Sequence, residues 1–113
     1  MDLRGHLDLM LLATLLTTGP AHGYRLISAL RMNSHGAFDL PEGTVYPALH
    51  RLERVGAVTS SWDTSLPRKR RIYDLTEDGR AMLARRQREW SRFAKAMAAI
   101  VGHVPVEAGR GTA

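Results

Sequence analysis

The chain has 113 residues and no cysteine, and its 16 lysine and arginine residues outnumber its 11 aspartate and glutamate residues, giving a formal net charge of +5. This length fits one domain with a thin core, and the lack of cysteine excludes disulfides, thiolate metal sites and cysteine nucleophiles. Acidic and basic residues balance over residues 1–40, so the positive excess lies in residues 41–113 and predicts an anionic partner for that part.

The first predicted element is a helix that ends at Thr18-Gly19-Pro20. Apolar residues recur along it at helical spacing and leave little polar surface, so we expect burial on more than one side. The glycine suits a C-cap, and the proline disfavours helix at the residue before it.

The apolar run 9–16 is not expected to enter a membrane. It is far shorter than the roughly 20 residues that span a bilayer, and Asp2 and Asp8 remove the positive flank of a signal peptide. We therefore expect no membrane partner and a cytoplasmic location.

A second helix is predicted from about Ala21 to Met32, and the sequence 33–36 breaks it. Tyr24 lies near its start. Its hydroxyl could bind a phosphate, or the ring could be half-buried as an ordinary aromatic, and both interpretations stay open.

A third helix is predicted between Pro41 and Val55, with Gly56 as the residue after its end. Its start is ambiguous, because Pro47 inside a helix removes a backbone hydrogen bond. A kinked helix, or a late start with Thr44 as N-cap, is favoured.

The two sides of this third helix differ in chemistry. One face is apolar and is expected in the core: Val45, Ala48, Leu49 and Leu52. The outer side carries groups that can bind a ligand: Thr44, Tyr46, His50 and Arg51.

Two short β-prone runs, 58–63 and 71–75, predict a hairpin. The connection 64–67 is followed by the densest charge in the chain, which we call the basic cluster: Arg68, Lys69, Arg70 and Arg71. Taken alone, such a run is most often a solvated surface. Beside the outer side of the third helix, it would form one continuous cationic surface.

The last predicted helix spans 77–101, with Thr76 as its N-cap. Trp90, Phe93 and Met97 recur along it at helical spacing, as in a helix that pairs with a second copy. These side chains could form a dimer core, or Trp90 could stack on a flat ligand in the dimer seam. Residues 102–113 lack periodicity, and we expect them to be disordered.

Three helices, a hairpin and a long helix make a mainly α fold with a small β-hairpin, the order of a winged helix-turn-helix with a long C-terminal dimerisation helix. We expect a DNA-binding domain at 1–76, a dimerisation helix at 77–101 and a tail at 102–113. The third helix would be the recognition helix and the hairpin the wing.

Catalysis is not expected. The sequence has no glycine-rich phosphate loop, its five histidines lack metal-ligand spacing, and no carboxylate pair shares a predicted face. We predict a chain that is not an enzyme and has no cofactor and no metal.

Duplex DNA is the favoured partner. The basic cluster would neutralise phosphates without reading sequence. On the third helix, Arg51 could bind guanine, His50 could bond a base edge, and Thr44 and Tyr46 could hold phosphates or touch a thymine methyl. The acidic Glu42 and Glu53 lie near this surface, and we expect them to face basic neighbours or turn away.

Two alternatives remain. A basic RNA-binding protein needs aromatic stacking platforms, and none is found beside the basic cluster. A winged-helix protein-interaction module would leave the cluster as solvated charge.

The chain resembles the PadR family of bacterial transcriptional regulators over roughly residues 7–97. Three separated motifs carry the resemblance: Gly-Pro-Ala-His-Gly-Tyr at 19–24, Gly-Thr-Val-Tyr-Pro-Ala-Leu-His-Arg-Leu-Glu at 43–53, and Tyr-Asp-Leu-Thr-Glu-Asp-Gly at 73–79. A single C-terminal helix with Trp90 and Phe93 is similar to the short subfamily.

The resemblance implies a homodimer on a pseudo-palindromic operator, commonly a repressor, that a hydrophobic or aromatic effector beside Trp90 releases. This chain departs from the family pattern at the wing tip, where Ser65-Leu66-Pro67 replaces a common glycine. It also departs at Arg25, a position that is often acidic.

Overall fold

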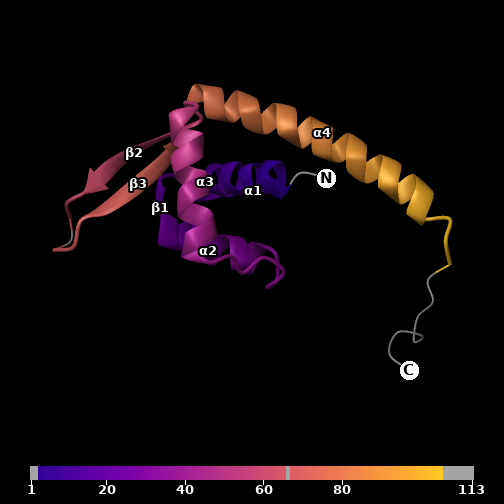
Figure 1. Ribbon diagram of the computed structural model, residues 1–113, viewed down its shortest axis with the longest axis horizontal. Coiled ribbons are helices and arrows are strands. Elements are labelled where there is room, and N and C mark those ends of the chain that lie inside the picture. Colours follow the sequence, from indigo (N-terminus) through magenta and orange to yellow (C-terminus); the bar gives the residue numbers. More distant parts are fainter. Residues whose placement is uncertain (1–2, 66, 106–113) are drawn as a thin grey trace.

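The computed structural model describes residues 3–65 and 67–105, and it consists of four helices and three strands (Figure 1). In chain order the elements are α1 (Leu3–Thr18), β1 (Ala21–His22), α2 (Gly23–Asn33), α3 (Glu42–Arg54), β2 (Val58–Asp63), β3 (Arg70–Leu75) and α4 (Glu77–Val101). The predicted mainly α winged helix with a long last helix is confirmed. The part of the expected tail at 106–113 lies outside the described residues.

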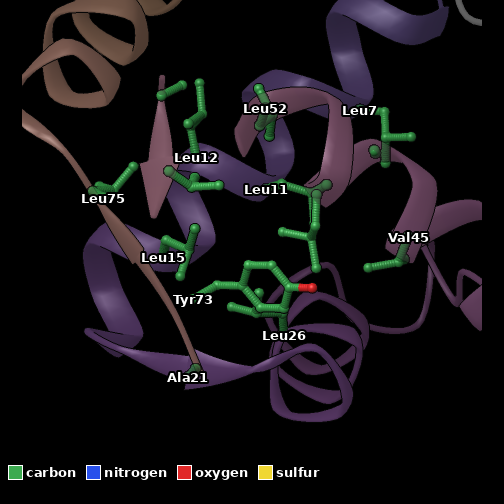
Figure 2. Close-up of a cluster of buried hydrophobic side chains, with 14 of the residues drawn as sticks. Leu7, Leu11, Leu12, Leu15, Ala21, Leu26, Val45, Leu52, Tyr73 and Leu75 are labelled. Carbon is green, nitrogen blue, oxygen red and sulfur yellow. The ribbon is translucent and has the colours of Figure 1, made fainter. Parts of the chain in front are cut away.

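The core surrounds α1, which contacts α2, α3, α4 and β3. Leu11, Leu12 and Leu15 of α1 are fully buried and meet Leu26 of α2 and Tyr73 of β3 (Figure 2). Contact with four elements explains why the sequence of α1 leaves so little polar surface. The predicted burial of this helix on more than one side is confirmed.

The sheet has a third strand that the sequence did not indicate. β1 pairs antiparallel with β3, Ala21 opposite Tyr73, and the sheet order is β1-β3-β2. Two residues are too few to show an alternating pattern. Because β1 takes Ala21 and His22, the second helix begins at Gly23, and the predicted start at Ala21 is wrong.

Helix α3 begins at Glu42 with Pro41 at the N-cap, so the late start at Thr44 is wrong. The backbone N–H groups of Thr44 and Val45 both donate to the Pro41 carbonyl, which completes a helical turn before Pro47 is reached. Pro47 removes one backbone bond, but the apolar face of the helix is buried as predicted and outweighs this loss.

Thr76 is the N-cap of α4, as predicted, and its side chain accepts a hydrogen bond from the Gly79 N–H at 3.0 Å. The same hydroxyl donates to the Gly56 carbonyl at 2.5 Å. This one side chain therefore fixes the start of α4 against the turn that follows α3.

Gly79 sits where α4 passes closest to the chain after α3. A Cβ there would lie 1.9 Å from the Ala57 carbonyl oxygen, which is backbone and has little freedom to move. We expect Gly79→Ala to lower the free energy of unfolding by about 1–3 kcal/mol, because the helix must shift to relieve the overlap.

Urea denaturation followed by circular dichroism measures this change. Gly43→Ala is the matched control, since no atom lies within 4 Å of a Cβ at Gly43 and alanine favours helix. If both variants had the same stability, the close approach of α4 to Ala57 would be contradicted.

Candidate nucleic-acid interface

A groove of about 600 Å³ lies between α3, the wing formed by β2 and β3, and the start of α2. In Figure 1 the wing extends away from the helices, and α4 extends in the other direction. Seven of the nine residues predicted to contact DNA line this groove: Tyr24, Tyr46, His50, Arg68, Lys69, Arg70 and Arg71. Three segments far apart in sequence thus form one cationic, aromatic surface.

Of the remaining two predicted residues, Thr44 is exposed on α3 but does not line the groove. Arg51 is turned the other way, and its Nη2 donates to the Asp8 carboxylate on α1 at 2.6 Å. An arginine held by a buried carboxylate is not available to a guanine edge. We therefore assign Arg51 an internal role in place of base reading.

Asp8 anchors Arg51, a role that its sequence position alone did not indicate. It is 6% exposed, and its second oxygen lies 3.9 Å from Nη2 of Arg86 on α4. Asp8 thus joins α1 to α3 through Arg51 and to α4 through Arg86. Its only sequence signal was a single carboxylate within an apolar helix.

The two glutamates near the groove behave differently. Glu53 of α3 accepts a hydrogen bond from the Ser60 hydroxyl at 2.6 Å, and that hydroxyl oxygen accepts from Nε of Arg71 at 3.1 Å. Glu53 therefore faces a basic neighbour through one serine, as expected. Glu42 is exposed and lines the same groove as the basic cluster, and it forms no ion pair among the described residues.

Tyr46 reaches the groove because α2 begins with a glycine. A Cβ at Gly23 would lie 2.6 Å from the Tyr46 ring, so a larger residue would displace the ring. Tyr24, the next residue, is 67% exposed. The interpretation of Tyr24 as a half-buried aromatic is therefore wrong, and Tyr24 is among the residues that line the groove.

A polar contact ties the last residue of β2, next to the loop of the wing, to His22 of β1. His22 Nε2 lies 3.0 Å from Oδ2 of Asp63, and Asp63 Oδ1 accepts hydrogen bonds from the Ser65 backbone N–H and hydroxyl. The pKa of Asp63 is lowered below its usual value. The two hydrogen bonds from Ser65 are the largest cause, and the contact with His22 is a smaller one. The carboxylate form of Asp63 therefore holds the wing in place.

Acid should release this contact. Because the pKa of Asp63 is lowered in the folded chain, its stabilising effect is complete above the ordinary aspartate pKa of about 3.9 and is lost as the pH falls through the lower folded value. In a Trp90→Phe variant, Trp62 reports on the wing alone. We expect its fluorescence to change over this acid range, and Asp63→Asn should remove that step. A signal that stays constant in both variants would contradict the role of Asp63.

The wing also carries an aromatic residue that the sequence analysis did not recognise. Trp62 is 57% exposed, lines the groove, and lies beside the basic cluster. The basic cluster therefore does have an aromatic side chain beside it, and the expectation of none was wrong. Trp62 pairs in register with Arg71 across the hairpin, a relation that only strand pairing reveals.

A second, smaller groove of about 300 Å³ lies between α1 and α4. Trp90 and Phe93 both line it, with ring centroids 5.8 Å apart, and His6 of α1 meets Trp90 edge-on at 5.5 Å. Met97 does not line this groove and is 44% exposed further along α4. The structure thus brings together two of the three residues predicted for the dimer core or an effector.

Comparison with known proteins identifies the family. The family model described as the transcriptional regulator PadR-like family matches residues 11–85. The chain belongs to the PadR-like family. A transcriptional regulator of Mycobacterium tuberculosis is 36% identical over 91 residues, which cover 80% of this chain and 79% of that protein. An uncharacterised protein of Lysinibacillus sphaericus is 30% identical over 90 residues, covering 79% and 82%.

Solved structures agree with this PadR-like assignment. A transcriptional regulator from Clostridium thermocellum superimposes with a TM-score of 0.79 at 28% identity, covering 87% of this chain and 95% of that chain. A PadR family regulator from Eggerthella lenta gives 0.75 at 28% identity, covering 89% and 86%. The chain is thus a winged-helix, DNA-binding transcriptional regulator of the PadR-like family. In the part of the chain that the structure describes, no helix combines the length and apolarity needed to cross a bilayer.

Proposed function

We propose that this PadR-like regulator binds an operator in duplex DNA as a homodimer, represses transcription in the cytoplasm, and catalyses no reaction. The observation that carries the proposal is the 600 Å³ groove, in which one helix, one hairpin and one helix start present cations and aromatic hydroxyls together. Grouped cations bind phosphates, and an exposed helix beside them can read base edges.

Within this proposal, α3 lies in the major groove with His50 and Thr44 near base edges. His50 is exposed on the outer side of α3 and its ring can donate or accept. Tyr24 and Tyr46 would bond phosphates, and the basic cluster on the wing would neutralise the adjacent backbone. No ion pair involves the four cations of the cluster among the described residues, so their charge is free for an anion.

His50→Ala should reduce discrimination between the operator and unrelated duplex by about 1 kcal/mol while leaving the salt dependence unchanged, because a contact to a base edge neutralises no phosphate. Competition binding against mixed-sequence duplex measures the ratio. His35→Ala is the matched control, since His35 is exposed on the turn after α2, away from the groove. Equal loss in both variants would show that His50 reads no base.

The proposed dimer uses the last helix. The outer half of α4 exposes a row of large apolar side chains that a single chain does not cover: Trp90, Phe93, Met97 and Ile100. A second copy would bury them and separate two recognition helices by about one turn of duplex. We further propose that a flat hydrophobic or aromatic effector binds in the groove beside Trp90 and releases DNA.

Fragments of the parent genome, above all those upstream of its own gene, test this function directly. We expect a retarded complex that protects two half-sites, and a dimer at micromolar concentration in sedimentation. A chain that stayed monomeric and bound no fragment at low salt would refute the proposal. The exposed Trp62 favours a second candidate function, RNA binding, because an exposed aromatic ring can stack on a base. Competition between duplex DNA and structured RNA distinguishes DNA binding from RNA binding.

A further inference from the structure

Trp62 and Arg71 face the groove from the inner side of the wing. Residues opposite each other in an antiparallel pair share one face of the sheet, and Trp62 lies opposite Arg71. The buried Val58 and Tyr73 belong to the same face, because side chains alternate along each strand. The face of the wing that packs on the core near Val58 and Tyr73 therefore carries Trp62 and Arg71 further toward its tip.

Three contacts fix Arg71 in this position. Its guanidinium carbon lies 4.8 Å from the centroid of the Trp62 ring, and its Nε donates to Ser60, which in turn donates to Glu53 of α3. Stacking on an aromatic face leaves the edge of a guanidinium open to further acceptors. These contacts link Glu53 of α3 to Arg71 of the wing through Ser60. The Arg71 side chain is therefore already oriented in the absence of DNA.

The position of the groove indicates which part of DNA enters it. When α3 lies in a major groove and the wing reaches the neighbouring minor groove, a single sugar–phosphate strand separates them. The space between α3 and the wing must therefore receive that strand. A phosphate matches the free edge of Arg71, and the apolar face of a deoxyribose matches the exposed indole of Trp62.

We propose that Trp62 is a further DNA-contact residue, which packs against the deoxyribose of this strand and holds Arg71 toward the adjacent phosphate. The inference rests on the proposed binding of duplex DNA. It adds an apolar, sequence-independent contact to a surface otherwise composed of cations and polar groups. Glu53 and Ser60 act as positioning residues for Arg71.

The test uses the full chain and a fluorescein-labelled mixed-sequence duplex of about 30 base pairs, long enough for two half-sites. Binding is titrated between low and moderate salt for Trp62→Ala, Trp62→Phe, Arg71→Ala and the double variant Trp62→Ala with Arg71→Ala. Val55→Ala is the control, because Val55 is 60% exposed and does not line the groove. Thermal unfolding verifies that each variant folds.

We expect Trp62→Ala to weaken binding about fivefold to tenfold, and Trp62→Phe, which keeps an aromatic ring, to recover most of this loss. Arg71→Ala should lower the magnitude of the salt slope by about 1 per subunit, since each subunit loses one phosphate contact. The double variant should lose less than the product of the two single losses, because the two residues act as a unit.

Binding by Trp62→Ala within twofold of the control would overturn the inference while leaving the proposed function intact. The inference would also be overturned if the affinity losses of the two single variants multiplied in the double variant. It would be overturned as well if Trp62→Ala lost more affinity for the matching single strand than for the duplex, because Trp62 would then contact unpaired bases. A wild-type chain that binds no duplex at all would instead refute the proposed function on which the inference rests.

Discussion

Replacing all four cations of the basic cluster with glutamine will abolish most of the salt dependence of DNA binding and weaken binding to every sequence alike. Each phosphate contact contributes about 0.9 to the slope of log K against log salt, so four lost contacts reduce it by about three to four per subunit. Over a fourfold rise in salt this corresponds to about two orders of magnitude in affinity for each bound subunit. Fluorescence anisotropy at several salt concentrations measures both quantities.

The matched control removes four other exposed arginines, all on α4: Arg80, Arg85, Arg88 and Arg92. Both variants lose the same formal charge, but only the wing variant loses cations from the groove. Sedimentation verifies that each remains in the same oligomeric state. Equal reductions of the slope would indicate a general charge effect and would contradict the wing as the phosphate-binding element.

Replacing Asp8 with alanine will lower the free energy of unfolding by about 3–5 kcal/mol, because it leaves Arg51 facing α1 without a counter-charge. The Asp8 side chain is 9% exposed and that of Arg51 23% exposed, so water screens the remaining charge poorly. Nε of Arg51 and Nε of Arg86 are already buried without a hydrogen-bond partner among the described residues. Urea denaturation at neutral pH measures the loss.

Asp39→Ala is the control for this variant, since Asp39 is exposed between α2 and α3 and an exposed charge contributes little. Asp8→Asn separates charge from shape, and we expect it to lose nearly as much as Asp8→Ala. A loss at Asp8 no larger than that at Asp39 would mean that Arg51 is not anchored on α1. The recognition helix would then need another explanation for its orientation.

Local signals predicted most helix ends. Gly19 and Gly56 have positive φ, as expected of residues that end helices, and Thr76 caps α4 with its own side chain. These features depend on a few consecutive residues, so they are readable without a fold. The wrong start of α3 had a different origin, because burial of the apolar face of the helix outweighs the local cost of Pro47.

The sequence likewise indicated some residues of the candidate site and not others. The basic cluster and the outer side of α3 were visible as charge and periodicity, and the groove contains both. The sequence did not indicate that Arg51 turns away from the groove or that Trp62 lines it. Arg51 is drawn to a carboxylate 43 positions away, and Trp62 joins the site through its register with Arg71 on the partner strand.

The amino-acid order alone determined the fold class, the position of the wing and the sign of the charge that faces a ligand, because helix periodicity, capping and charge density act over short stretches of chain. The tertiary structure alone decided that β1 completes the sheet, that Arg51 turns inward to Asp8, and that Arg71 lies over the Trp62 ring. These contacts form between segments distant in sequence, and their partners are defined only once burial and strand register bring those segments together.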